Sequence, residues 1–337
     1  MTADELSPRD NLWRMANAYQ VSQAIHVAAS LGIADLLEDG PRSVDDLAEV
    51  SGAHAPTLYR LLRALASVGV FAETEGRFGL TPPAEYLRTD APGSLRAWAM
   101  QIGQPYFWTS WGHLLHSVGT GEPAFPKLYG MTAWEYRAAH PEEDAVFNAA
   151  MTTLSSIVGE AVVRSYDFSE FGILVDVGGG EGVLLAAILG TNPTLHGVLF
   201  DQPHVVASAG ALLERASVAD RCEVVGGSFF DAVPGTADAY LLKSIIHDWD
   251  DAAAVEILRV CRAAMDGTGR LLVVEPIIRP GNELDPAKFS DLNMLVMLGG
   301  RERTADDFER LYAEAGFRLA NVVRTGSSFD IIEGVPV

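Results

Sequence analysis

Four glycines within five residues, placed directly after an apolar run, constrain this chain more than any other feature. The run Ile173–Val177 predicts a buried strand, residues 178–182 a tight turn, and residues 183–189 a helix. A strand, a glycine turn and a helix in this order open a doubly wound α/β domain. Because glycine adopts positive φ and lets the backbone approach a ligand closely, the turn predicts a binding site beyond the carboxyl end of the strand.

The spacing of these glycines indicates which ligand fits. A dinucleotide fingerprint needs Gly-x-Gly-x-x-Gly, but its third glycine position falls on Val183 or Leu185 in the two possible registers. A nicotinamide-dependent dehydrogenase is therefore disfavoured. The pattern Asp-x-Gly-x-Gly-x-Gly, from Asp176 to Gly182, resembles the first motif of methyltransferases that use S-adenosylmethionine (SAM).

The 337 residues are enough for two domains with cores of their own. Residues 1–165 predict a mostly helical domain that contains a winged helix, and residues 166–337 predict a Rossmann-like α/β domain. The last two strands of the second domain have no helix between them, which indicates an antiparallel pair. Its strands are predicted at 173–177, 195–200, 222–225, 239–242, 270–275, 318–323 and 328–333.

The first domain bears on possible partners. Residues 11–37 predict two apolar helices, broken near Gly32, that must be buried either against a second subunit or in the chain's own core. Residues 43–87 predict helix, turn, helix and a two-stranded wing. This segment carries three arginines against six acids, and the whole chain has a formal net charge of −21. This acidic balance disfavours nucleic-acid binding. The apolar helices at 11–37 lead us to expect a homodimer.

The chain is expected to be a soluble cytoplasmic protein. Its first ten residues are polar and partly acidic, so no signal peptide is expected, and no apolar run approaches the ~20 residues of a membrane helix. Cys222 and Cys261 predict neither a disulfide framework nor a metal site. His113 and His116 lack a third ligand at suitable spacing, so no metal is predicted.

Candidate site residues follow the ends of the predicted strands, which meet at one edge of a parallel sheet. Asp201 ends the second strand, where an acid can accept hydrogen bonds from ribose hydroxyls. His247 follows the fourth strand and suits a general base that works near neutral pH. Glu275 and Glu302 would converge on its imidazole, orient the ring and stabilise the cation formed on proton uptake.

Three motifs in combination resemble one family. They are Asp-Val-Gly-Gly-Gly-Glu-Gly at 176–182, Lys-Ser-Ile-Ile-His-Asp-Trp at 243–249 and Gly-Gly-Arg-Glu-Arg-Thr at 299–304. The chain resembles the SAM-dependent O-methyltransferases of the plant caffeate type, and more closely their bacterial relatives that modify aromatic polyketides and other natural products. The resemblance spans residues 11–332. It implies an N-terminal winged-helix dimerisation domain, a C-terminal SAM domain and a place in natural-product or antibiotic biosynthesis.

The resemblance also implies roles for single residues. His247 matches the catalytic base, with Glu275 and Glu302 as its flanking acids. The positions that match cofactor contacts are Ser155, Asp176, Gly178, Gly180, Asp201, Ser228, Phe229, Lys243 and Trp249. Ser228 stands where many members carry an adenine-binding Asp. The positions that match the acceptor pocket are Phe147, Met151, Asp248, Asn293, Met294 and Met297.

The expected reaction is in-line transfer of a methyl group to a hydroxyl of a small aromatic molecule, with S-adenosylhomocysteine as the product. The protein would position the acceptor oxygen while His247 removes its proton. One alternative is a SAM-binding homologue that runs N- or C-methylation, hydroxylation or cyclisation. The other, from a different class, is a winged-helix DNA-binding regulator.

Overall fold

The structure is a computed structural model that describes residues 7–337 and divides into two compact units. The first unit runs up to Thr109 and includes Arg137–Thr153, and the second unit holds Ser110–Tyr136 and Leu154–Val337. Most of the polar N-terminal stretch that argues against a signal peptide lies outside the described residues. The division at residue 165 inferred from the sequence stays a prediction.

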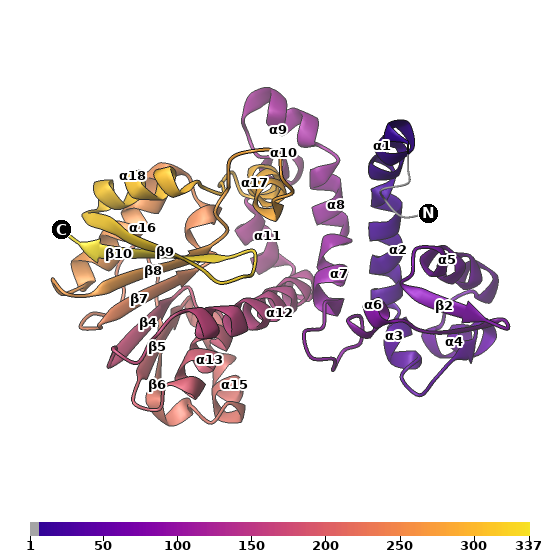
Figure 1. The fold of residues 1–337 in the computed structure, drawn as a ribbon, viewed down its shortest axis with the longest axis horizontal. Coiled ribbons are helices and arrows are strands. Elements are labelled where there is room, and N and C mark those ends of the chain that lie inside the picture. Colours follow the sequence, from indigo (N-terminus) through magenta and orange to yellow (C-terminus); the bar gives the residue numbers. More distant parts are fainter. Residues whose placement is uncertain (1–6) are drawn as a thin grey trace. The chain divides into compact units, whose positions relative to one another are not determined.

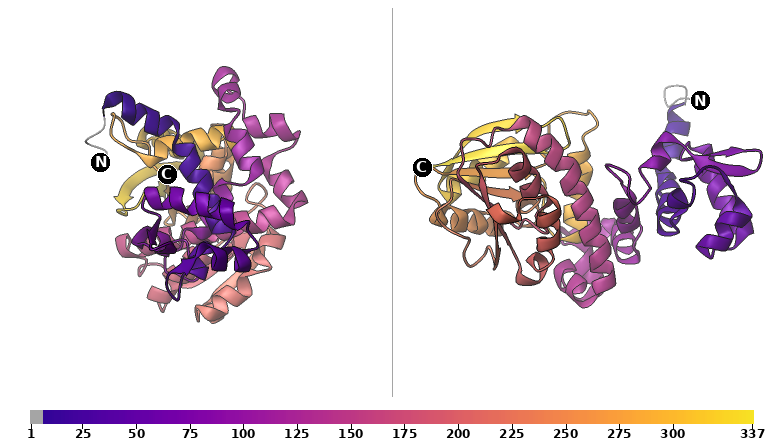
Figure 2. Two further views of the ribbon diagram at one scale, coloured as in Figure 1. Left: turned by 90° about the vertical axis from the view of Figure 1, so that its right-hand side faces the viewer. Right: turned by 90° about the horizontal axis from the view of Figure 1, so that it is seen from below.

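The first unit contains the predicted winged helix. Its elements are β1 (Arg42–Ser43), α4 (Val44–Ser51), α5 (Ala55–Ser67), β2 (Phe71–Thr74) and β3 (Arg77–Leu80). Ser43 caps α4, since its Oγ accepts the Asp46 N–H at 3.2 Å while the Asp46 carboxylate accepts the Ser43 N–H at 3.3 Å. β3 pairs antiparallel with both β1 and β2, and the right-hand view of Figure 2 shows the β2–β3 hairpin beside the helices.

The N-terminal apolar stretch forms three helices: α1 (Pro8–Ala16), α2 (Ala18–Ser30) and α3 (Ile33–Leu36). The predicted break at Gly32 is present, with φ of 65° in the left-handed region. A further break, which the sequence analysis missed, falls at Asn17, whose side-chain amide donates to the Trp13 carbonyl at 2.8 Å. Residues of α2 and α3 are buried in the core of the first unit, but α1 buries none.

Seven helices follow the wing. They are α6 (Pro82–Glu85), α7 (Arg96–Ile102), α8 (Pro105–Trp111), α9 (Leu114–Thr120), α10 (Ala124–Tyr129), α11 (Ala133–Ala139) and α12 (Pro141–Ser165). The expectation that no apolar run has membrane-spanning length was wrong for α12, which passes that test by length and composition. In the second unit, Val158 and Val162 of α12 are buried among core residues, which explains its apolar character.

A seven-stranded sheet forms the centre of the second unit (Figure 1). Its strands are β4 (Ile173–Val177), β5 (His196–Asp201), β6 (Cys222–Gly226), β7 (Ala239–Lys243), β8 (Arg270–Glu275), β9 (Phe317–Arg324) and β10 (Asp330–Pro336). The order is β6-β5-β4-β7-β8-β10-β9, with β4 to β8 parallel and β10 antiparallel to both neighbours. The predicted doubly wound domain with a terminal antiparallel pair is therefore confirmed.

Helices cover both faces of this sheet. They are α13 (Val183–Thr191), α14 (Pro203–Val206), α15 (Ala209–Arg215), α16 (Asp251–Ala264) and α18 (Ala305–Ala315), with short 3₁₀ turns η2 (Ala219–Arg221) and η3 (Ile246–Asp248). A further helix, α17 (Pro286–Met297), packs against α9 and α10. Val175 and Val177 of β4 pack in the layer of α16 and α18, and Leu174 packs in the layer of α12 and α13. The strand order reverses at β4, which lies between β5 and β7, so a ligand crevice is expected beyond the carboxyl end of β4.

Candidate active site

The turn after β4 depends on glycines with positive φ. Gly178, Gly180 and Gly182 have φ of 71°, 61° and 85°, in the left-handed region that L side chains rarely adopt. A Cβ on Gly178 would lie 2.4 Å from Cδ1 of Ile245. The Gly178 N–H donates to the Phe200 carbonyl at 2.7 Å, which ties the turn to the end of β5. The turn therefore presents bare backbone at the crevice.

Two aspartates lie beside this turn. The carboxylate of Asp201 accepts the Gly180 N–H at 2.8 Å and the Gln202 N–H at 2.6 Å, and burial raises its pKa. A carboxylate has four lone-pair positions, so room remains for ribose hydroxyls. Asp176 is buried, and its Oδ2 has no hydrogen-bond partner within residues 7–337. Burial raises the pKa of Asp176 to about 7, which the nearby Lys243 opposes.

The adenine-side candidates come together beside the glycine turn. The rings of Phe229 and Trp249 meet edge to face at 6.2 Å, and Phe230 meets Trp249 at 4.8 Å. Phe229 reaches within 3.7 Å of the position that a Cβ on Gly178 would take. Ser228 uses its hydroxyl to accept the Phe230 N–H at 3.3 Å, so it shapes this turn.

Lys243 and Ser155 complete the candidates for cofactor binding. Burial lowers the pKa of Lys243, while Asp176 opposes that shift, and its Nζ donates to Ser244 Oγ at 3.2 Å. Ser155 lies one helical turn before Gly159, where an added Cβ would contact Leu184 in the first turn of α13. A bare glycine turn, an unpartnered buried carboxylate oxygen and two aromatic faces fit SAM, which carries positive charge, ribose and adenine.

His247 has a defined tautomer because of its neighbour. Its Nδ1 lies 2.9 Å from Oε1 of Glu302, whose side chain has 0% exposure. A carboxylate oxygen there accepts the Nδ1–H of the neutral ring, which leaves Nε2 to accept a proton. Asp248 Oδ1 lies 3.5 Å from Nε2. Burial alone would lower the pKa of His247, but the carboxylates of Glu302 and Asp248 outweigh burial and raise it to about 10, which corrects the expectation of a base that titrates near neutral pH.

Glu275 has no hydrogen bond to the imidazole, so it does not orient the ring directly as expected, but its charge helps to raise the pKa of His247. Its Oε1 accepts the backbone N–H of Ile245 at 3.1 Å and of His247 at 3.0 Å. Burial raises the pKa of Glu275 to about 7, and the charge of His247 opposes that rise. Glu275 thus fixes the main chain that carries the base.

Three residues that the sequence analysis did not select hold this site together. Ser290 donates to Glu302 Oε1 at 2.6 Å, and Asp291 accepts the Glu302 N–H at 2.9 Å. Arg303 is fully buried and donates to the carbonyls of Ile246 and Trp249, both at 2.9 Å. Only Arg303 lies in a recognised motif. Ser290 and Asp291 lie on α17 without any local pattern that marks them.

Two aspartates at the start of α16 have different contacts. The Asp250 carboxylate caps the helix by accepting the Ala253 N–H at 2.9 Å. Oδ1 of Asp251 lies 2.8 Å from the Arg303 guanidinium, so Asp251 helps to position this buried arginine.

The segment after α17 packs directly on the His247 turn. A Cβ on Gly300 would lie 2.1 Å from the His247 carbonyl oxygen and 2.5 Å from the Asp248 carbonyl carbon. The Arg301 N–H donates to the same His247 carbonyl at 2.8 Å. The Gly-Gly-Arg-Glu-Arg-Thr motif is therefore the structural partner of the segment that carries His247.

The acceptor-side candidates fall into two groups. Asn293, Met294 and Met297 lie on α17 in the second unit, with both methionines buried. The Asn293 side chain accepts the Trp111 indole N–H at 3.0 Å, a contact that the sequence analysis did not anticipate. Phe147 and Met151 lie on α12 in the first unit, where the Phe147 ring packs 3.5 Å from the Arg137 guanidinium. Their part in an acceptor pocket stays a prediction.

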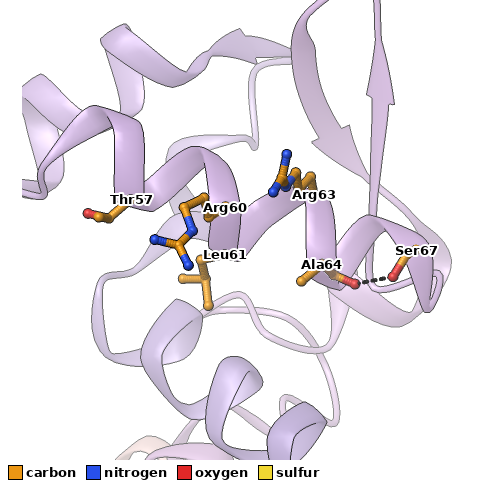
Figure 3. Close-up of a pocket in the computed structure, with 6 residues that line it drawn as sticks. All are labelled: Thr57, Arg60, Leu61, Arg63, Ala64 and Ser67. Carbon is orange, nitrogen blue, oxygen red and sulfur yellow. Dashed lines mark hydrogen bonds between the residues drawn. The ribbon is translucent and has the colours of Figure 1, made fainter.

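Two further features bear on DNA binding and on metal binding. A shallow hollow on the outer face of α5 is lined by Thr57, Arg60, Leu61, Arg63, Ala64 and Ser67, as Figure 3 shows. None of these is a predicted site residue, and two arginines alone do not make the basic surface of a DNA reader. Among residues 7–337, no group of three or more His, Cys, Asp or Glu side chains is placed to hold a metal ion.

Comparison with known proteins gives a consistent result. An O-methyltransferase domain model matches residues 111–318, and an O-methyltransferase dimerisation domain model matches residues 13–90. The chain is 48% identical to phenazine O-methyltransferase PhzM of Lysobacter antibioticus, over 97% of this chain and 96% of that protein.

Solved structures agree. The crystal structure of LaPhzM has a TM-score of 0.95 and 47% identity, covering 98% of this chain and 100% of that one. The O-methyltransferase NcsB1 from neocarzinostatin biosynthesis, solved with SAM and 2-hydroxy-5-methyl naphthoic acid, has a TM-score of 0.79 and 35% identity. That comparison covers 94% of this chain and 96% of NcsB1.

Proposed function

This chain belongs to the SAM-dependent O-methyltransferase family, and we propose that it methylates a hydroxyl of a small aromatic natural product, with His247 as the general base. The observation that carries the proposal is the 2.9 Å contact between His247 Nδ1 and Glu302, which leaves Nε2 as the proton acceptor. The names of the similar enzymes, a phenazine and a naphthoic acid among them, support an aromatic acceptor.

The cofactor would be held by the residues at the ends of the parallel strands. Gly178 and Gly180 would face its methionine part, Asp201 its ribose, and Phe229 with Trp249 its adenine. Bound SAM supplies a methyl group on a sulfonium, which is already electrophilic. The protein therefore has to position the acceptor oxygen and take its proton. Holding the reactants in line can contribute about 7–11 kcal/mol in the best cases.

Proton removal falls to His247. The neutral ring donates Nδ1–H to Glu302 and accepts the hydroxyl proton at Nε2, and the two carboxylates near the ring stabilise the imidazolium that forms. Glu275 holds the backbone N–H groups of Ile245 and His247, so the ring keeps its position during the transfer. The proton then leaves to water after the product dissociates.

His247→Ala tests the proposal. We expect turnover of an aromatic hydroxyl to fall roughly 10²–10⁴-fold, while calorimetry shows S-adenosylhomocysteine affinity near that of the wild type. The wild-type rate should rise with pH through the raised pKa of His247, because only the neutral ring accepts a proton. The variant should lose the contribution of His247 at every pH and keep only the smaller rise that ionisation of the phenol itself produces, near a pKa of 10.

His196→Ala is the matched control, because His196 is exposed at the amino end of β5. It should change neither turnover nor cofactor affinity. Unchanged turnover in His247→Ala would contradict the role of this residue as the base. Methylation at nitrogen or carbon by the wild-type protein, with hydroxyls untouched, would favour the divergent chemistry instead.

A further inference from the structure

We propose that Ser244 is a positioning residue: it turns the chain at the end of β7 and holds the ammonium of Lys243 beside the glycine turn. Ser244 is not among the candidate site residues, and it lies between Lys243 and the turn that carries His247. The inference rests on the proposed function and adds the residue that would keep this lysine charged and in place for the cofactor.

The backbone of Ser244 has an unusual conformation. Its φ is 56°, in the left-handed region that residues other than glycine, asparagine and aspartate rarely adopt. Within residues 7–337, the other non-glycine residues with positive φ are all exposed: Glu75, Ser217 and Thr236. Ser244 is partly buried and directly follows a strand of the central sheet. Strained backbone in such a place indicates a functional constraint.

The left-handed turn allows two neighbouring side chains to meet. Successive side chains of an extended strand point to opposite faces of the sheet. The chain leaves that pattern at Ser244, whose Oγ accepts a hydrogen bond from Lys243 Nζ at 3.2 Å. The Ser244 N–H still donates to the Val274 carbonyl at 3.2 Å, so the sheet holds the turn in place. Across residues 7–337, no other group accepts a hydrogen bond from this ammonium.

Lys243 lies at the level of the glycine turn. The strands β4 and β7 are parallel, with Asp176 beside Leu241. Continuing this register by two residues brings Lys243 level with Gly178. Ile245, on the other side of the left-handed turn, packs on the same glycine, because its Cδ1 lies 2.4 Å from the position of a Cβ there. The left-handed turn thus places both of its neighbours at the predicted cofactor site.

The charge of Lys243 depends on its surroundings. Burial lowers the pKa of Lys243. Carboxylates from three packed elements oppose this shift: Asp176 on β4, Asp248 in η3 and Glu275 on β8. The hydrogen bond to the Ser244 hydroxyl also favours the charged form, because the ammonium donates it. An ammonium that stays charged here can pair with the carboxylate in the methionine part of the cofactor.

The charge of Lys243 can be measured directly, because the chain has only three lysines: Lys127, Lys243 and Lys288. Carbon-13 labelling of the lysine Cε atoms therefore gives three signals in an NMR titration, and Lys243→Arg identifies one of them. In Ser244→Ala the ammonium loses its acceptor, so the Lys243 signal should titrate about one pH unit lower than in the wild type.

Cofactor affinity should change with this titration. Calorimetry should show S-adenosylhomocysteine binding weakened about tenfold in Ser244→Ala. Lysine is charged below its pKa, so a lowered pKa leaves more of the variant's Lys243 neutral as the pH rises. The loss of affinity should therefore be larger at alkaline than at neutral pH.

Two variants serve as rescue and control. Ser244→Asn should restore the titration and the affinity, since asparagine tolerates positive φ and keeps an oxygen for the ammonium. Ser217→Ala is the matched control, because Ser217 has φ of 57° but is exposed just after α15. Its hydroxyl makes no hydrogen bond within residues 7–337. This variant should change neither measurement.

Ser244→Gly separates the hydroxyl from the backbone, because glycine adopts positive φ without strain and also lacks the hydroxyl. It should lower the Lys243 titration as Ser244→Ala does, but unfold at a higher temperature, and it carries the test if Ser244→Ala does not fold. Lys243 titrations that coincide in wild type, Ser244→Ala and Ser244→Gly overturn the inference while the proposed function stands. If the titrations move as expected but wild-type protein methylates no aromatic hydroxyl, the inference stands and the proposed function fails.

Discussion

Ser290 shows how strongly the base depends on a side chain with no chemistry of its own. Its hydroxyl and the His247 ring share one oxygen of Glu302, at 2.6 Å and 2.9 Å. The other oxygen of Glu302, Oε2, is buried and has no hydrogen-bond partner in the described residues. Ser290 is therefore one of two side chains that stabilise this buried carboxylate, and it fixes the oxygen that sets the His247 tautomer.

Removing that hydroxyl should alter the pH profile as well as the rate. In Ser290→Ala the Glu302 carboxylate no longer shares its charge with a hydroxyl, so it stabilises the imidazolium more. The pKa of His247 should rise further, and the acidic limb of kcat/KM should move up by about one pH unit. We expect kcat to fall on the order of tenfold with KM for SAM unchanged.

Ser290→Thr serves as the rescue variant because it keeps the hydroxyl at the same place on α17. Its pH profile should follow that of the wild type. If the acidic limbs of Ser290→Ala and wild type coincide, the serine has only a structural role.

At this scale the sequence reveals some site residues and hides others. His247 and Glu302 lie in recognisable motifs, so their chemistry could be predicted. Trp111 and Asn293 are 182 positions apart and meet only in the folded chain. Glu275 was found for the right reason, its place at the end of a strand, but its contact is with main chain. A contact of that kind leaves no mark on residue type or spacing.

At the level of elements, the site is two segments packed on each other. The turn around η3 carries His247, and residues 299–304 pack on this turn. Gly300 lies against the His247 carbonyl, and the Arg303 side chain donates to the carbonyls of Ile246 and Trp249. Arg303 is charged and buried, so its removal would take hydrogen bonds from these carbonyls and from Asp251. The close approach at Gly300 is what permits this packing.

Gly300→Ala should therefore disturb both stability and activity. The added methyl group meets the His247 carbonyl oxygen at 2.1 Å, so one of the two segments must move. We expect the free energy of unfolding to fall by about 1–3 kcal/mol in urea denaturation, and turnover to fall more than SAM affinity.

Gly190→Ala is the matched control, because it lies in α13 with no atom within 4 Å of an added Cβ. There alanine should stabilise by up to ~1 kcal/mol. Equal stability changes in the two variants would show that the close contact at Gly300 does not determine the loss of stability.

The limits of the buried strands were predicted better than the breaks between helices. The limits of β4 and β8 agree with the apolar runs, because a strand buried on both faces leaves a continuous signal. The break at Asn17 was missed, because a single Asn between two helix-forming stretches does not predict a break. The apolar length of α12 was also missed, because it mixes alanines, a glycine and small polar residues.

For the whole molecule, net charge and exposed apolar surface have opposite effects on dimer formation. The formal net charge of −21 disfavours bringing two copies together. Yet α1 exposes 64% of Leu12, 73% of Trp13 and 54% of Met15. These side chains lie within or beside the range that the dimerisation domain model matches. Burial of apolar area at ~25 cal/mol per Å² can outweigh repulsion that salt screens.

We therefore expect a homodimer that α1 helps to hold. Light scattering at micromolar concentration should give about twice the 36.2 kDa mass of the chain. Because salt screens like charges but not apolar burial, the dimer should persist or tighten as ionic strength rises. Trp13→Asp with Leu12→Asp should shift the mass toward one chain, whereas Val224→Asp, on an exposed apolar residue of the edge strand β6, should leave the dimer intact. A double variant that stays dimeric at the lowest concentration measured would place the interface elsewhere than α1, and a wild-type monomer of full activity would refute the dimer altogether.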